Sequence, residues 1–155
     1  MTTAIDTNIL IDLRVLDSPH FERSAEVIQR AAAEGPLIIG EVVYAELSAR
    51  MADGELASFI SDLGIQYEPS PPAALRRAGA VYRRFASNRG QTVQCASCGS
   101  RFRALCPRCA QAVAWRQHLI PDFLVAAHAE ALAGQLLTRD RGLYGRFFPG
   151  LARYV

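Results

Sequence analysis

Four acidic residues occur where apolar runs end or helices begin, and such positions can bring side chains to one edge of a parallel sheet. Asp6 follows a short apolar run, and Asp140 ends a strand-like run. Glu46 lies in a helical segment behind another apolar run, and Asp122 begins an apolar helix. Open α/β sheets hold their ligands beyond the carboxyl ends of the strands. The alternatives are local: Asp6 as a helix cap and Glu46 as a solvated helix residue.

Carboxylates gathered at one place repel one another unless a cation lies between them. Hard divalent cations prefer oxygen ligands, so Mg²⁺ or Mn²⁺ is the metal expected here. The histidines His20, His118 and His128 are too far apart in sequence to form a cluster. His128, on an apolar helix, is interpreted as a hydrogen-bonded core residue. Asp12 is left out of the site because its place on the first helix is compatible with exposure to solvent.

All the cysteines belong to two Cys-x-x-Cys pairs in the middle of the chain. They are Cys95, Cys98, Cys106 and Cys109, with seven residues between the pairs. This spacing predicts a structural zinc site in which the protein fills all four positions of a tetrahedron. The alternatives are two disulfides or four free thiols. A reducing compartment disfavours the disulfides. The segment 91–118 is therefore predicted to be a small zinc-binding insertion.

The charge of the chain is unevenly distributed. All 17 basic residues are arginine, and the stretch 69–121 holds nine of them and no acid. The remainder holds the other eight arginines and all 15 acids. A basic segment beside an acidic site suits a protein that gathers carboxylates around a metal and holds a polyanion beside it. The alternative for this segment is a solvated arginine-rich helix. Within it, Arg101, Arg103 and Arg108, beside Phe102, are the candidate RNA-binding residues. The alternative for these three is a docking surface for a protein partner.

Strands that alternate with helices predict a parallel sheet covered on both faces. Strands are expected at 37–39, 65–67, 135–138 and 152–155, in addition to the run before Asp6. Helices are expected at 9–16, 21–34, 41–51, 56–63, 71–88, 122–133 and 141–144. On the helix at 71–88, Leu75, Ala78, Val81 or Tyr82, and Phe85 are expected to form the buried face. The prediction is one α/β domain over 1–155.

Short motifs around the acids resemble those of PIN-domain nucleases, and specifically the VapC-family toxins. They are Asp-Thr-Asn at 6–8, Ala-Glu-Leu at 45–47, Pro-Asp at 121–122 and Thr-Arg-Asp at 138–140, with the tail Phe147–Leu151. The resemblance covers the chain except the cysteine-bearing insertion. It implies a three-layer α/β/α PIN-like fold and metal-dependent hydrolysis of RNA phosphodiester bonds. Asp6 would be the central metal ligand, completed by Glu46, Asp122 and Asp140. Thr7, Asn8 and Thr138 are candidates to hydrogen-bond the ligands or a phosphate.

The same resemblance implies partners: a small antitoxin protein and a second copy of the chain in a homodimer. Two other functions remain open at this point, an RNA-processing nuclease of the ribosomal-RNA maturation kind and a non-catalytic PIN domain that binds RNA or protein. The presence of all four acids favours catalysis. The N-terminus has no signal-peptide pattern, and no run of about 18 apolar residues occurs, so a cytoplasmic protein is expected.

Overall fold

The central sheet has five parallel strands. The computed structural model describes residues 1–155 except 16, 88–91, 95–99, 114–119, 141–142 and 155. The strands are β1 (Thr3–Ile5), β2 (Leu37–Ile39), β3 (Ile65–Tyr67), β6 (Gln135–Leu137) and β7 (Ala152–Tyr154). Their order is β3–β2–β1–β6–β7, and every neighbouring pair is parallel. The chain therefore reverses its direction of travel across the sheet between β1 and β6.

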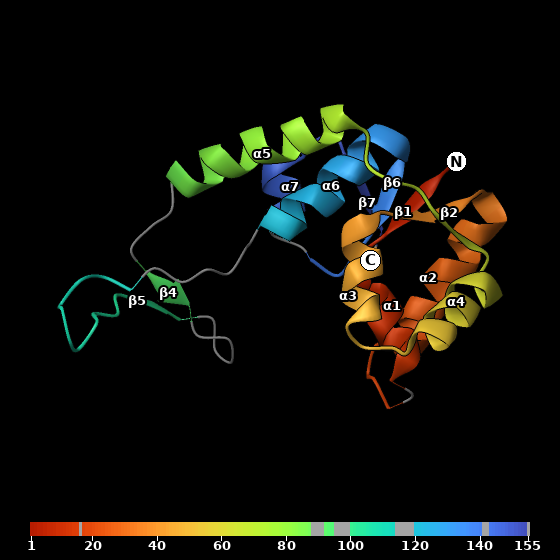
Figure 1. Cartoon of the computed structure of the whole chain (residues 1–155), viewed down its shortest axis with the longest axis horizontal. Helices are drawn as coiled ribbons and strands as arrows, with labels where there is room; N and C mark the ends of the chain where they lie inside the picture. Colours follow the sequence, from red (N-terminus) through yellow and green to blue (C-terminus); the bar gives the residue numbers. More distant parts are fainter. Residues whose placement is uncertain (16, 88–91, 95–99, 114–119, 141–142, 155) are drawn as a thin grey trace.

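Seven helices in the described ranges flank this sheet (Figure 1). They are α1 (Thr7–Arg14), α2 (Phe21–Glu34), α3 (Glu41–Ser48), α4 (Asp53–Asp62), α5 (Pro72–Ser87), α6 (Ile120–Leu132) and α7 (Leu143–Phe147). Helix α6 packs against β1 and β6, with α5 along its outer side, whereas α1 packs against α2 and α3. The predicted α/β fold with a central parallel sheet is confirmed. Across the described part of the chain, no helix is both long and apolar enough to span a membrane.

Burial explains why such short strands suffice. The residues of β1, β2 and β6 are buried throughout, which is expected of strands covered on both faces. Helix α6 is buried from Val125 to Ala129, as its apolar sequence predicted. One prediction for α5 is wrong: Leu75 is 42% exposed, and Ala74 is buried in its place. The close packing of α5 on α6 selects a small side chain there.

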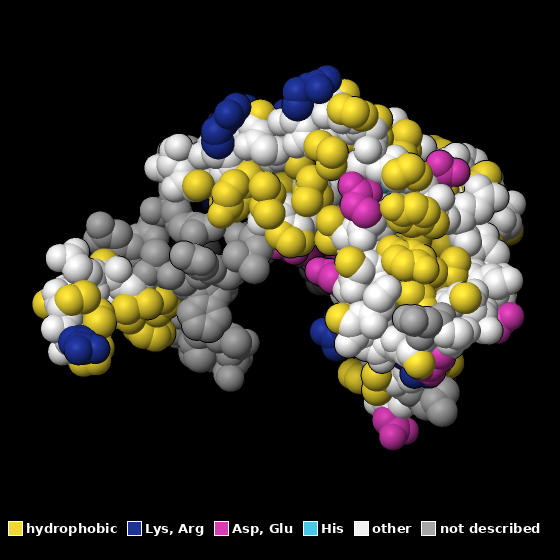
Figure 2. All heavy atoms as spheres, viewed as in Figure 1, with side chains coloured by type: hydrophobic (Ala, Val, Ile, Leu, Met, Phe, Trp, Pro, Cys, Tyr) yellow, Lys and Arg dark blue, Asp and Glu magenta, His cyan; other side chains and the backbone are white. Residues whose placement is uncertain are grey.

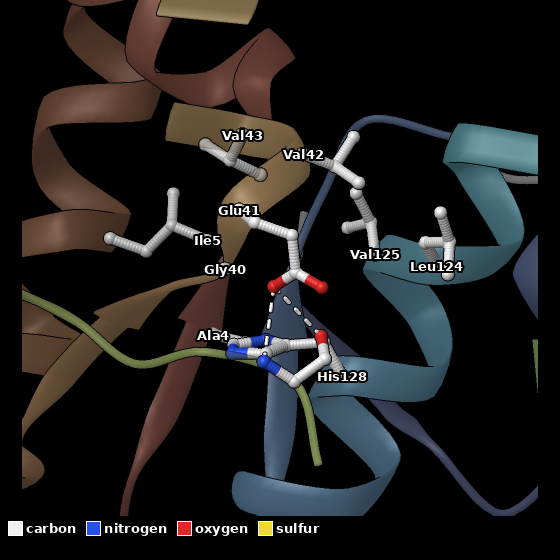
Figure 3. A pocket seen from close by; sticks show the side chains of 10 residues that line it. Ala4, Ile5, Gly40, Glu41, Val42, Val43, Leu124, Val125 and His128 are labelled. Carbon is white, nitrogen blue, oxygen red and sulfur yellow. Dashed lines mark hydrogen bonds between the residues drawn. The ribbon is translucent and has the colours of Figure 1, made fainter. Parts of the chain in front are cut away.

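Polar contacts join the start of α3 to α6 and to the segment between β3 and α5 (Figure 3). The ring of His128 is buried and its Nε2 lies 2.8 Å from the carbonyl oxygen of Glu68, so its interpretation as a hydrogen-bonded core residue is confirmed. The Glu41 carboxylate accepts hydrogen bonds from the backbone N–H and hydroxyl of Ser70, each at 3.0 Å. A Cβ at Gly40 would lie 2.9 Å from the His128 ring, so only glycine fits between β2 and α3. These contacts set where α3 begins.

A small antiparallel pair of strands stands apart from the sheet. It belongs to the segment 91–118, which is called the cysteine module below. Strands β4 (Val93–Gln94) and β5 (Arg101–Phe102) form the pair, and Figure 1 shows it beyond the ends of α5 and α6. In Figure 2 acidic side chains lie where the surface of the main body turns inward, on the side that faces this pair of strands. Cys95 and Cys98, predicted as zinc ligands, lie outside the described residues.

Candidate active site

The site begins where β1 meets its neighbour β6. Asp6 follows the last residue of β1, and its backbone N–H donates to the carbonyl oxygen of Leu137 at the end of β6, at 2.9 Å. Between these two strands the direction of travel reverses, which is where open α/β sheets leave a crevice for ligands. Asp6 occupies the N-cap position of α1 but makes no side-chain capping bond. Its carboxylate is therefore free of a capping role and can bind a ligand.

The Asp6 carboxylate is fixed by three side chains, one from the next turn of the chain and two from its C-terminal part. Its Oδ2 atom accepts hydrogen bonds from Asn8 Nδ2 at 2.7 Å, Thr138 Oγ1 at 2.6 Å and the Tyr144 hydroxyl at 3.3 Å. The Thr138 hydroxyl also accepts the backbone N–H of Asp140 at 3.1 Å. Asp6 is 8% exposed, so these bonds orient a nearly buried carboxylate. The turn that carries Asp140 is tied to the same group.

The four predicted acids lie around one open cavity of about 380 Å³. Its lining includes Asp6 after β1, Glu46 on α3, Asp122 in the first turn of α6 and Asp140 after β6. The Thr7 hydroxyl donates a short hydrogen bond to the Glu46 carboxylate, which holds that side chain toward α1. Thus Thr7, like the Asn8 and Thr138 side chains at Asp6, contacts a carboxylate of the cavity. The structure brings together acidic residues up to 134 positions apart, from Asp6 to Asp140.

The electrostatics of this cavity favour a cation. Burial raises the pKa of Asp6 above its ordinary value, and the nearby charge of Asp122 acts in the same direction, against the lowering effect of the Thr138 and Tyr144 hydrogen bonds. Burial also raises the pKa of the Tyr144 phenol, reinforced by the charges of Asp6, Asp122 and Asp140. Tyr144 therefore remains a hydrogen-bond donor. A positive ion would relieve the cost of ionising Asp6.

The donor set fits a hard divalent cation, because carboxylate oxygens are the ligands that Mg²⁺ and Mn²⁺ prefer. Among the residues that the structure describes, no three such side chains already converge on a single point as closely as a preformed ion site requires. The carboxylates surround an open space instead. Mg²⁺ keeps several of its waters when it binds proteins, so a surrounding arrangement with room for water suits it.

Two residues of the cavity were missed from the sequence. Tyr144, on α7, is 2% exposed and reaches Asp6, but a tyrosine on a short C-terminal helix carries no local signal of that contact. Arg50 lines the cavity just beyond the end of α3. Arg50 follows Glu46 by four residues, and this spacing could have predicted that both side chains lie on the same face of the helix.

The interpretation of Asp12 as a solvent-compatible residue is wrong. Asp12 is 4% exposed and accepts hydrogen bonds from the Ser24 hydroxyl at 2.8 Å and the Ser18 hydroxyl at 3.2 Å. It does not line the acidic cavity. Its exclusion from the set of metal ligands therefore agrees with the geometry, although for a different reason. Asp12 lies on the side of α1 that packs against α2, away from the acidic cavity.

The described half of the cysteine module forms a tight turn. The nearby backbone N–H groups of Arg108 and Cys109, together with the Cys109 side chain, lower the pKa of the Cys106 thiol. Ala110 has φ of 56° and donates its N–H to the Cys106 carbonyl oxygen at 2.8 Å. Backbone N–H groups directed at a sulfur favour the thiolate, which is the form that binds metals. The described turn thus holds Cys106 and Cys109 three residues apart, with the thiol of Cys106 favoured in its ionised form.

Of the candidate RNA-binding arginines, the described side chains of Arg103 and Arg108 do not line the acidic cavity. Arg103 and Arg108 are exposed, and Arg101 begins β5, although its side chain lies outside the described set. Phe102, beside them, is 53% exposed. All three belong to the module that Figure 1 shows away from the central sheet.

Comparisons with known proteins agree with this architecture. The family model described as "PIN domain" matches residues 3–146. Among solved structures, the chain is similar to one from Rickettsia felis, described as VapBC2 bound to a DNA fragment from its promoter. The TM-score is 0.63 at 15% sequence identity, over 99% of this chain and 98% of that one. At this identity the likeness shows a shared fold. No curated protein matches the chain significantly in sequence.

Proposed function

The chain belongs to the PIN-domain family, and from that premise we propose that it is a metal-dependent endoribonuclease. Proteins of this family are typically metal-dependent nucleases. One observation carries the proposal: the four acids Asp6, Glu46, Asp122 and Asp140 line one cavity at the switch point of the sheet. A solvated helix residue or a helix cap would not need to meet three other acids.

Each side chain of the cavity has a role in this proposal. Asp6 is the central ligand, since its Oδ2 is fixed by three hydrogen bonds and cannot rotate away. Asp122, Asp140 and Glu46 complete the ligand set directly or through water. When bound, Mg²⁺ or Mn²⁺ supplies an activated water and neutralises charge on the phosphate. Thr138 holds the backbone of Asp140, and Thr7 holds Glu46, so both position ligands.

The direct test is cleavage of a labelled single-stranded RNA by purified protein with Mg²⁺ or Mn²⁺, compared with excess EDTA. The proposal expects internal cleavage that needs the added metal. Mapping the new 5′ and 3′ ends distinguishes an endonuclease from trimming at the termini. A wild-type protein that cleaves no RNA with either metal, or that cleaves equally well in EDTA, contradicts the proposal.

The proposed biological setting is a toxin paired with a small antitoxin, acting as a homodimer. The fold likeness to a chain of a VapBC structure, together with the motifs around the acids, supports this choice over a ribosomal-RNA maturation nuclease. Growth arrest on induced expression, relieved by co-expression of a neighbouring small reading frame, is the expected result. Continued growth at full expression of active protein would favour the maturation alternative.

The proposal includes a structural Zn²⁺ held by Cys95, Cys98, Cys106 and Cys109. What supports it is the spacing of the two pairs, together with the tight turn at Cys106 and the lowered pKa of its thiol. The module would present Arg101, Arg103 and Arg108 to the RNA backbone. Replacing all three with alanine is expected to weaken RNA binding and flatten its salt dependence. A triple variant with unchanged RNA binding that fails to bind the antitoxin or to dimerise would make the module a protein-docking element.

A further inference from the structure

Arg50 contributes the one basic side chain among the described residues that line the acidic cavity. Its backbone is firmly placed: its N–H donates to the carbonyl oxygen of Leu47 at 2.9 Å, and both Leu47 and Met51 are buried. The side chain of Arg50 is exposed. An anchored backbone with an exposed cationic side chain can direct that charge into the cavity, and burial or packing does not account for the choice of arginine.

The charge of Arg50 is not neutralised by the acid nearest to it in sequence. Arg50 follows Glu46 by four residues, a spacing at which opposite charges commonly pair along a helix. Glu46 instead receives a hydrogen bond from the Thr7 hydroxyl. Within the part of the chain that the structure describes, the ion pairs engage Arg14, Arg23, Arg30, Arg77 and Arg139 but not Arg50. Arg50 is thus available to a ligand.

We propose that Arg50 binds a phosphate of the RNA backbone next to the phosphate that is cleaved. This inference rests on the proposed nuclease function and extends it, because it names a substrate-binding residue on the rim of the cavity. A pocket of four carboxylates repels a polyanion except where a metal lies, so a neighbouring phosphate needs a cation of its own. The guanidinium group offers two parallel N–H donors that match the oxygens of a phosphate. A neutral side chain at this position would leave that phosphate facing the acids.

The test uses Arg50→Gln, which removes the charge and keeps much of the length, and Arg50→Lys, which keeps the charge. Arg23→Gln on α2 is the matched control, because Arg23 does not line the cavity and its loss changes the net charge equally. Binding of a labelled single-stranded RNA is measured in an Asp6→Asn background, with Mg²⁺, from low to high salt. Cleavage by the variants with intact Asp6 is measured in parallel, and circular dichroism establishes that each variant is folded.

We expect Arg50→Gln to raise the Kd for RNA about tenfold and to reduce the slope of log Kd against log salt by about 0.7, the share of one phosphate contact on a single strand. Arg50→Lys should restore part of the affinity and the whole slope. The KM for cleavage should rise by a larger factor than the one by which kcat falls, because the contact persists from substrate binding through the transition state.

Several results would overturn the inference. Equal Kd and slope for Arg50→Gln and Arg23→Gln, beside an active wild type, refute the role of Arg50 while the nuclease function stands. An unchanged Kd with a lower kcat would assign Arg50 to the chemical step. Tighter binding or faster cleavage by Arg50→Gln would mean that Arg50 competes with RNA for the acids. A wild type that neither binds nor cleaves RNA removes the nuclease proposal and this inference together.

Discussion

Arg139 Nε lies 2.9 Å from Oδ2 of Asp12, and this ion pair joins α1 to the turn that follows β6. The side chain of Asp12 is 5% exposed and that of Arg139 is 37% exposed. The Nε–H is not aligned for a hydrogen bond with any described partner, so the contact is an attraction between charges. The backbone N–H of Arg139 donates to Asn8 Oδ1 at 3.1 Å. The turn that carries Asp140 is therefore held to α1 twice.

Replacing Asp12 with alanine should destabilise the protein by about 2 kcal/mol, since the Ser18 and Ser24 hydroxyls lose a charged acceptor and Arg139 loses its partner. The estimate is kept low because water reaches Arg139 and screens its charge. Urea unfolding measures the free energy. Glu26→Ala, which breaks exposed pairs with Arg23 and Arg30, is the control and should cost under about 1 kcal/mol. Equal losses in the two variants would refute a special role for Asp12.

Asp6→Asn should abolish cleavage and leave the fold intact, because it removes a metal-binding charge at nearly constant volume. Glu46→Gln, Asp122→Asn and Asp140→Asn should also reduce cleavage strongly. Asp62→Asn, an exposed acid at the end of α4, is the matched control and should cleave like the wild type. Rates are measured on one labelled RNA with Mn²⁺, alongside thermal unfolding. Full activity in Asp6→Asn would eliminate the proposed metal site.

The stability of the metal-free protein should depend on pH through Asp6. Burial raises the pKa of this carboxyl above 3.8, so the folded state binds its proton more tightly than the unfolded state does. The Asp6 contribution to stability is therefore retained at pH below 3.8 and is lost as the pH rises through the folded pKa. Asp6→Asn lacks this loss, so the difference in unfolding free energy between wild type and variant should grow in favour of the variant from low pH toward neutrality. Saturating Mg²⁺ should stabilise the wild type selectively; a pH-independent difference would contradict the prediction.

Tyr144→Phe should weaken metal binding without removing the site, because it deletes the hydroxyl that donates to Asp6 Oδ2 and leaves the ring in the core. The concentration of Mn²⁺ that gives half-maximal cleavage is expected to rise about tenfold, as for other residues that orient a metal ligand. Tyr44→Phe on α3 serves as control, since Tyr44 is 39% exposed and does not line the cavity. An unchanged Mn²⁺ dependence in Tyr144→Phe would limit Tyr144 to packing.

Purified protein should contain about one zinc per chain, bound by thiolates. Cys106→Ser and Cys95→Ser should each lose it and unfold the 91–118 module, while the α/β core retains its thermal transition. Elemental analysis and thiol titration before and after treatment with a chelator provide the measurement. Absence of zinc, with four thiols that titrate freely from the start, would show that the cysteines do not form this site.

Much of the fold follows from local pattern. The run Leu37–Ile39 between Pro36 and Gly40 is apolar at every position, and it forms a strand because only a site buried on both faces removes all three side chains from water. Helix α2 runs from Phe21 to Glu34 as predicted, since its apolar residues recur with the helical period. The positions of Asp6 and Asp140 at one edge of the sheet could likewise be predicted, because each follows a strand and parallel strands present their carboxyl ends at one edge.

Other features depend on contacts between residues far apart in sequence. The adjacency of β1 and β6, which brings Thr138 to Asp6, is a property of strand order, and no local pattern specifies that order. The burial of Asp12 could not be predicted either, because it depends on contacts with α2 and with the distant Arg139. The same holds for Tyr144, whose hydroxyl meets Asp6 because α7 packs beside the end of β1. Residue types determined which groups can do chemistry, and the packing of the sheet and its helices decided which of them meet.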